Sequence, residues 1–177
     1  MVTVREVREG DREWVARFLA EEWGSSVIVT RGKIHRGEAL PGFVAESERK
    51  RIGLITYRID SGECEVISLN SLQERAGVGS RLLLAVENEA LRAGCARFFL
   101  ITTNDNFPAI RFYKRRGFFV RAVRRDAVEL SRRLKPSIPR IGFCGLPLRH
   151  EVEMELPLVR SGRDSGKNLV FRAGPIG

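Results

Sequence analysis

The feature that most constrains the fold is an amphipathic helix that follows a glycine-rich turn and a series of β-rich segments. Between Val78 and Arg92, the apolar residues Val78, Leu82, Val86 and Ala90 recur at every fourth position. This spacing is typical of a helix that buries one face. The segments before it are rich in β-branched and aromatic residues, which favours strands. A chain that combines such a helix with such strands is expected to form a sheet covered by helices.

The same reading of periodicity along the chain divides it into short strands and helices. Strands are predicted over 2–7, 42–47, 52–59, 63–69, 98–102, 118–123 and 151–156. Helices are predicted over 11–23, 78–92, 108–116 and 127–134. Asp11 is the expected N-cap of the first helix and Gly24 its expected stop. The segment 25–40 has no clear period and several turn residues, so a loop with a short helix is expected there.

The order of these segments predicts the fold class. One strand and one helix are followed by three strands in a meander, and then by alternating strands and helices. We therefore expect an α/β (α+β mixed) fold, with a mostly antiparallel mixed sheet of about seven strands and helices on both faces. Glutamates alternate with apolar residues over 151–156, which predicts a last strand with one exposed face.

Length and composition indicate one ordinary domain with a basic surface. The chain has 177 residues, which fits a domain over 1–159 followed by a basic C-terminal extension over 160–177. The formal net charge of +9 favours anionic partners. Cys64, Cys95 and Cys144 are widely spaced, so neither a disulfide framework nor a metal site is expected. Neither a long apolar span nor a signal core is apparent, and we expect a cytoplasmic protein.

The strongest local signal is a turn suited to binding phosphate. Arg75-Ala-Gly77-Val-Gly79-Ser-Arg81 lies between a predicted strand and the helix that starts near Val78. Glycines permit positive φ and let an anion approach the main chain, while the first amides of the helix are unpaired. The alternative is a tight strand-to-helix turn in which glycine serves geometry alone.

Other phosphate-binding motifs fit this turn less well. A nucleotide-hydrolase P-loop needs Gly-Lys-Ser/Thr after the glycines, and the chain lacks it. A dinucleotide-binding fingerprint needs a third glycine where this chain has Leu82.

A second motif follows about thirty residues later: Asn106-Phe-Pro-Ala-Ile-Arg-Phe112-Tyr113-Lys-Arg-Arg-Gly117-Phe118. With the glycine-rich turn before it, this pattern resembles the GNAT superfamily of acyl-CoA N-acyltransferases, over roughly residues 3–156. The resemblance implies a domain that transfers an acetyl group from acetyl-CoA to an amine. One departure is Glu74, which stands where the family usually has Arg or Gln.

The resemblance implies which residues would bind acetyl-CoA. Its pyrophosphate would be held between Arg75 and Arg81, chiefly by main-chain amides. The main chain of Ile67 and Leu69 would pair with the pantetheine arm. Asn106 would bond the pantetheine or cap its helix, and Phe112 would pack beside the cofactor or in the core. The amides concerned belong to Gly77, Val78, Gly79 and Ser80.

The resemblance also indicates the catalytic groups. Tyr113 is expected near the cofactor sulfur, where a phenol can protonate the leaving thiolate. An attacking amine must lose a proton, and Glu63 and Glu65 lie on the strand before the turn. By strand parity they should face the same side as Ile67 and Leu69. His35 is the competing base, and water is a further alternative.

Two other functions compete with an acetyltransferase acting on an amine of a small molecule or a protein. One is an acyl-CoA-binding sensor without turnover, which would share the same cofactor half. The other is a basic nucleic-acid-binding protein; it is disfavoured because the positive charges between Arg111 and Arg133 match no nucleic-acid motif. No membrane partner is expected. Many members of the family that the chain resembles are dimers, so the resemblance suggests a homodimer.

Overall fold

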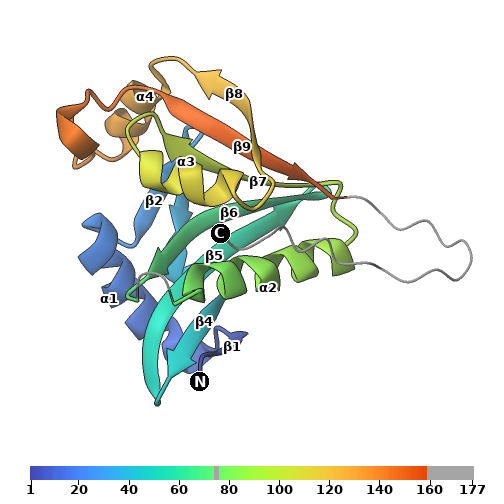
Figure 1. Cartoon of the computed structure of the whole chain (residues 1–177). Coiled ribbons are helices and arrows are strands. Elements are labelled where there is room, and N and C mark those ends of the chain that lie inside the picture. Colours follow the sequence, from blue (N-terminus) through green and yellow to red (C-terminus); the bar gives the residue numbers. More distant parts are fainter. Residues whose placement is uncertain (74–75, 159–177) are drawn as a thin grey trace, which may run out of the picture.

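The computed structural model describes residues 1–73 and 76–158, which fold around one seven-stranded sheet (Figure 1). The strand order is β1-β4-β5-β6-β7-β9-β8, and β2 and β3 form a separate hairpin. The strands are β1 (Thr3–Glu6), β2 (Val27–Thr30), β3 (Lys33–Arg36), β4 (Gly42–Ser47), β5 (Lys50–Asp60), β6 (Glu63–Ser71), β7 (Arg97–Thr103), β8 (Phe119–Arg124) and β9 (Glu151–Pro157). The helices are α1 (Arg12–Trp23), α2 (Val78–Arg92), α3 (Phe107–Lys114) and α4 (Ala127–Leu134).

Tight turns explain why the first half of the sheet is an antiparallel meander. Glu48 and Arg49 both have positive φ in the turn between β4 and β5. Ser61 and Gly62 also both have positive φ, in the turn between β5 and β6. Two successive residues with positive φ give the turn type that matches the twist of a hairpin. Among the described strands, only β6 and β7 pair in parallel, and α2 makes the crossover between them.

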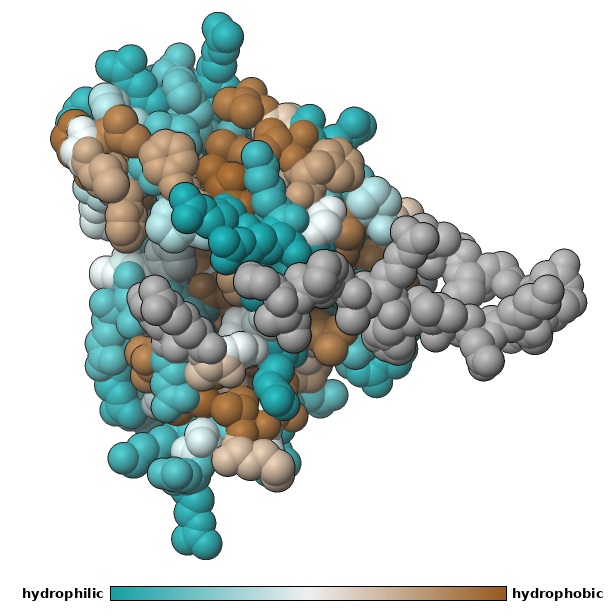
Figure 2. Space-filling model, viewed as in Figure 1, coloured by the Kyte–Doolittle hydropathy of each residue, from teal (hydrophilic) through white to brown (hydrophobic). Residues whose placement is uncertain are grey.

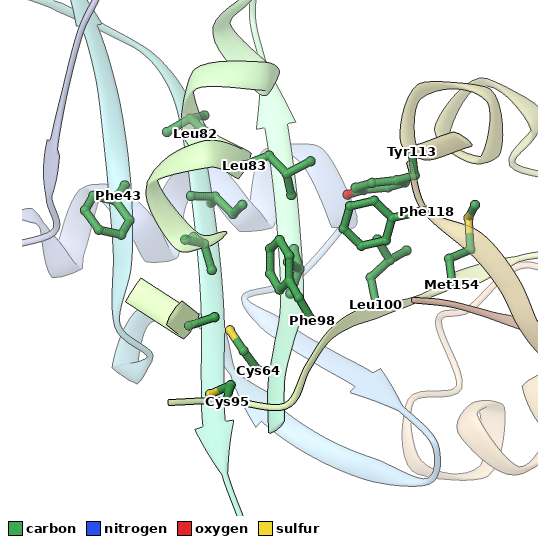
Figure 3. Close-up of a cluster of buried hydrophobic side chains, with 14 of the residues drawn as sticks. Phe43, Cys64, Leu82, Leu83, Cys95, Phe98, Leu100, Tyr113, Phe118 and Met154 are labelled. Carbon is green, nitrogen blue, oxygen red and sulfur yellow. The ribbon is translucent and has the colours of Figure 1, made fainter. Parts of the chain in front are cut away.

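Helices cover the sheet on both faces, as predicted. Figure 1 shows α2 and α3 in front of the sheet, with α1 and β2 on the far side. The larger core lies under α2 and α3, where Leu82, Phe98 and Tyr113 belong to one buried cluster (Figure 3). A smaller core lies between α1 and the sheet and consists of Val15, Phe18, Leu19, Val44 and Leu54. None of the helices formed by the described residues is long and apolar enough to cross a membrane.

Two local predictions near the N-terminus are corrected, one of them only in part. Asp11 and Gly24 are the N-cap and C-cap of α1, as predicted. The Asp11 carboxylate, however, caps no amide of α1; it accepts hydrogen bonds from the side chains of Arg5 and Arg51 and from the N–H of Arg8. The segment 25–40 contains the β2–β3 hairpin and one turn of 3-10 helix, rather than a loop with a short helix. The hairpin lies against β6 and α4, so tertiary contacts rather than local pattern stabilise it.

The last strand corrects a third prediction. β9 lies between β7 and β8 inside the sheet, so its glutamates are not exposed: two are buried and the third, Glu155, is partly buried. Glu151 and Glu153 are only 3% and 4% exposed. The outer edge is β8, whose apolar side chains Phe119, Val120 and Val123 remain exposed. Figure 2 shows hydrophobic residues gathered in this upper part of the molecule, around β8 and β9.

Candidate active site

A β-bulge in β6 opens the centre of the sheet. Thr56 on β5 pairs with Ser68, whereas the next residue, Tyr57, pairs with Val66, so Ile67 is the extra residue. Strand β6 pairs with β7 only from Glu63 to Val66. Beyond this point β6 continues along β5 and β7 continues along β9, with no ladder between them in the described residues. The main chain of β6 after Val66 therefore presents unpaired groups to the space between two diverging parallel strands.

The bulge corrects the prediction that Glu63, Glu65, Ile67 and Leu69 share one face. One inserted residue exchanges the faces of all side chains that follow it. Leu69 packs against the core under α2, together with Val66. Glu65 points to the opposite face, where it contacts the β2–β3 hairpin.

The first turn of α2 lies at the mouth of this opening. Val78 packs next to Gly53 on β5, and Gly79 packs against the Phe112 ring of α3. Gly77 adopts a left-handed conformation with φ of 70° and is the N-cap. A methyl group at Gly79 would lie only 3.1 Å from the Phe112 ring. Glycine is therefore needed at the two positions for different reasons. Gly77 adopts the left-handed conformation of the turn, and Gly79 allows the Phe112 ring to lie close to α2.

The amides of this turn are available to an anion. The first intrahelical bond is donated by the N–H of Arg81 to the carbonyl of Gly77. Within the described residues, the N–H groups of Val78, Gly79 and Ser80 have no such bond, and no acidic residue occupies the first turn. The helix dipole adds partial positive charge there. Arg75, also expected here, lies outside the described residues.

Arg116 is a site residue that the sequence analysis missed. Its guanidinium donates hydrogen bonds to the Ser80 hydroxyl and to the Phe112 carbonyl, and it lies 3.5 Å from the centre of the Phe112 ring. Its buried Nε–H has no acceptor in the part of the chain that the structure describes. Its side chain also has no carboxylate partner there. Arg116 therefore adds an uncompensated positive charge beside the free amides of α2.

Helix α3 positions Asn106 and Tyr113. The Asn106 carbonyl oxygen accepts a hydrogen bond from the Ala109 N–H at 3.2 Å, so Asn106 caps the helix. Tyr113 packs edge-on against Phe118, and Figure 3 shows its hydroxyl directed towards Leu83 and away from Met154. Burial raises the pKa of the Tyr113 phenol above its ordinary value, so the phenol keeps its proton at neutral pH.

On the opposite face, three buried side chains form a hydrogen-bonded chain. The Thr30 hydroxyl donates to the Glu65 carboxylate at 2.8 Å and lies 2.9 Å from Nε2 of His35. Because the single hydroxyl proton is used toward Glu65, Nε2 of His35 must carry a proton and donate to Thr30. The two candidate bases are therefore linked rather than separate. Thr30 was not foreseen, since its segment carries no readable pattern.

Burial controls the charge of both candidate bases. Desolvation raises the pKa of Glu65, although Thr30 and the charges of Arg31, Arg58 and Lys33 oppose the shift. Desolvation also lowers the pKa of His35, and the charges of Arg58 and Lys33 act in the same direction. His35 is therefore neutral near pH 7, while Glu65 is a stronger base than an ordinary carboxylate.

Glu63 occupies a different environment from Glu65. Its carboxylate accepts a hydrogen bond from Arg97 at 3.0 Å, and Arg97 also pairs with Glu153 and Glu155. The Glu63 side chain is 40% exposed. Glu63 is thus already paired with a cation and partly exposed, whereas Glu65 is buried without an ion pair among the described residues, so the geometry favours Glu65 as the base.

Comparisons with known proteins find a matching family and similar folds. The model of the Acetyltransferase (GNAT) family matches residues 9–118. The uncharacterized protein YdhI of Bacillus subtilis is 46% identical over 136 residues, covering 76% of this chain and 85% of that protein.

Solved structures of acetyltransferases share the fold. A Bacillus subtilis acetyltransferase in complex with CoA has a TM-score of 0.66 at 16% identity, covering 90% of this chain and all (100%) of that one. A putative streptothricin acetyltransferase from Bacillus anthracis, in complex with acetyl-CoA, has a TM-score of 0.64 at 14% identity, covering 89% and 100%.

Proposed function

Because the chain belongs to the acetyltransferase (GNAT) family, we propose that it is an N-acetyltransferase that moves the acetyl group of acetyl-CoA to a primary amine. One observation carries the proposal. A buried carboxylate, Glu65, lies on one face of the sheet, one residue before the pairing of β6 with β7 ends, and a buried phenol, Tyr113, belongs to the core cluster on the other face. The free amides of the first turn of α2 lie at the mouth of the opening between β6 and β7.

The residues at the opening fit acetyl-CoA as a co-substrate. The amides of Val78, Gly79 and Ser80 would bind the pyrophosphate, with Arg116 beside them and Arg81 on the exposed side of the helix. The unpaired main chain of β6 beyond Val66 would pair with the amides of the pantetheine arm, as an added strand does. The Asn106 side-chain amide is expected to contribute from α3.

The two buried groups have complementary roles in the transfer. The amine nitrogen attacks the thioester carbonyl carbon, forming a C–N bond as the C–S bond breaks. Glu65 accepts the proton that the amine loses, and Tyr113 donates a hydrogen bond or proton to the departing thiolate. An unpaired main-chain N–H at the Ile67 bulge would stabilise negative charge on the carbonyl oxygen. Reaction by direct attack needs no covalent enzyme intermediate.

Replacement of the chain's tyrosines tests the assignment. We expect Tyr113→Phe to lower kcat by about 100-fold, which is the low end for a general acid, with little change in acetyl-CoA affinity. The matched control is Tyr57→Phe, the only other tyrosine, which should leave kcat within about twofold. Thiol release reports kcat, and titration calorimetry reports affinity.

The same assays separate the competing functions. A sensor would bind acetyl-CoA and release no thiol with any amine. A nucleic-acid-binding protein would bind DNA or RNA with an affinity that falls steeply with salt, and would not bind acetyl-CoA. Equal kcat values for both tyrosine variants would contradict the role of Tyr113. The exposed apolar edge at β8 supports a homodimer, which stays a prediction, as does the cytoplasmic location.

A further inference from the structure

The glutamates of β6 and β9 that share one face of the sheet fall into two groups. Glu63, Glu153 and Glu155 all form ion pairs with Arg97, and Arg121 and Arg124 add to this network. Glu65 and Glu151 form no ion pair with any described residue. They are nevertheless buried, at 7% and 3% exposure. In a chain with 31 lysines and arginines, two buried carboxylates without a cation require a separate explanation.

Both carboxylates meet the tip of the β2–β3 hairpin. Thr30 donates its hydroxyl proton to Glu65 at 2.8 Å, and the N–H of the next residue, Arg31, lies 3.3 Å from Oε1 of Glu151. Because neighbouring residues make these contacts, the nearest carboxylate oxygens are at most about 11 Å apart. The hairpin thus places the two carboxylates over β7, near the opening that would hold the thioester.

One oxygen of Glu151 has no partner. Oε1 accepts hydrogen bonds from the Ser131 hydroxyl of α4 and the Arg31 N–H, whereas the buried Oε2 has no donor in the described part of the chain. Leaving a buried carboxylate oxygen unpaired costs free energy, which a donor on a bound molecule would recover.

The cations around the two carboxylates are engaged elsewhere. Arg124 lies opposite Glu151 in the strand register, but its guanidinium bonds Glu153 at 2.6 Å. The guanidinium of Arg31 lies over the Phe99 ring, and that of Arg58 pairs with Asp60. Lys33 is exposed, and His35 bonds Thr30 and is buried. None of these cations forms an ion pair with Glu65 or Glu151, so both carboxylates can accept a cation from a bound molecule.

We infer that the acceptor is a small dicationic amine, whose reacting nitrogen lies at Glu65 and whose second, charged nitrogen pairs with Glu151. The inference rests on the proposed acetyltransferase function and specifies its substrate class. The upper limit of about 11 Å between the carboxylate oxygens can accommodate nitrogens joined by roughly four to six methylene groups. Glu65 takes the proton from the first nitrogen, while the second nitrogen stays protonated and donates to Oε2 of Glu151.

A comparison of three amines of equal chain length tests this directly. Cadaverine carries two amines, pentylamine carries one, and aminovalerate replaces the second amine by a carboxylate. We expect kcat/KM for cadaverine to exceed that for pentylamine by about 10-fold or more, which is the value of one charge-assisted bond, with aminovalerate lowest. Glu151→Gln should reduce the cadaverine preference towards one.

A matched variant separates recognition from structure. Glu155→Gln changes a glutamate on the same strand and face that is paired with Arg97, and it should keep the cadaverine preference. If Glu151→Gln lowers kcat/KM equally for cadaverine and pentylamine, Glu151 is structural and the inference is wrong. Equal use of both amines by the wild-type protein overturns it as well, without any variant.

These results are distinct from a failure of the proposed function. Acetylation of pentylamine as fast as cadaverine overturns the dicationic acceptor and leaves an acetyltransferase in place. Absence of any calorimetric signal with acetyl-CoA, together with no thiol release from any amine, overturns both.

Discussion

At the residue scale, the chemistry of the site depends on burial more than on residue type. Glu63 and Glu65 are two positions apart on one strand, yet Glu63 is paired with Arg97 and Glu65 is bonded only to Thr30 among the described residues. The alternation of side chains along the predicted strand identified both glutamates as candidate bases. The difference between them arises from the β2–β3 hairpin, which covers one and leaves the other near solvent.

The Thr30–Glu65 hydrogen bond should be visible in the pH dependence of the reaction. Glu65 is an active base only when ionised, so kcat/KM should rise with pH through its pKa, which burial raises. Thr30→Val removes a bond that favours the ionised form and should move this rise to still higher pH. The measurement is kcat/KM for one amine across the acidic range.

Two controls accompany this prediction. Thr30→Ser keeps the hydroxyl and should restore the wild-type profile. Thr56→Val removes an equally buried hydroxyl that bonds Ser68 instead, and the profile should not move. An unchanged profile for Thr30→Val would show that Glu65 is not the base.

At the element scale, the site is made by a bulge in one strand and a turn before one helix. The bulge at Ile67 separates β6 from β7, and the left-handed Gly77 lets α2 start over the gap. Neither element is stabilised by the site itself; both are fixed by core contacts on the α2 side. The turn and the opening are therefore preformed.

Replacing Gly77 should separate the role of the turn from its conformational cost. Gly77 and Gly24 have nearly equal positive φ, and neither would bring a new methyl group into contact. Gly77→Ala and Gly24→Ala should each lower the free energy of unfolding by about 1 kcal/mol. Only Gly77→Ala should also weaken acetyl-CoA binding, by about tenfold if the amides shift. Urea denaturation and calorimetry measure the two effects, and equal affinities would contradict the anion site.

Elements with a strong local signal were predictable from the sequence. Helix α2 has the predicted bounds, and the β4–β5 hairpin and α4 lie where expected. What periodicity could not predict depends on tertiary contacts. The bulge at Ile67 inserts a residue without any compositional mark, so the predicted face of Leu69 was wrong. The alternation over β9 predicted exposed glutamates because the arginine partners of Glu153 and Glu155 come from β7 and β8.

The candidate site was predictable only in part, for the same reason. The glycine turn and Tyr113 belong to local motifs, and the structure places the turn at the start of α2 and Tyr113 in the core under α2 and α3. Thr30, Arg116 and Glu151 come from three separate segments, and no spacing links them to Glu65 or Ser80. Their contacts exist only once β2, α3 and β9 have packed against the sheet.

At the scale of the whole molecule, an ion-pair network fastens the N-terminal elements to the sheet. Asp11, before α1, pairs with Arg5 on β1 and Arg51 on β5, and Arg5 also pairs with Glu46 on β4. The hydrogen bond from Arg5 holds the pKa of the buried Asp11 carboxyl well below its usual range. A lowered pKa means that Asp11 stabilises the fold above its unfolded-state pKa, and less as the pH falls through the folded-state value.

Asp11→Asn should therefore destabilise the protein in a pH-dependent way. Loss of this buried partner should lower the free energy of unfolding by about 3 kcal/mol at pH 7. The difference from wild type should shrink as the pH is lowered below about 4. Asp60→Asn, which removes a more exposed partner of Arg58, should cost about 0.5 kcal/mol or less. Chemical denaturation across pH measures both, and a pH-independent difference would contradict this account.

The bulge in β6 also bears on how such a chain can diverge. The alternation of side chains along β6 shifts by one position at Ile67, so Glu65 and Leu69 lie on opposite faces of the sheet although both occupy odd positions. A substitution in the β2–β3 hairpin, which covers the face of Glu65, would leave the main chain of β6 beyond the bulge as it is. Under the proposed function, gene copies of this fold could therefore change their preferred amine through the hairpin while they keep the same acyl donor.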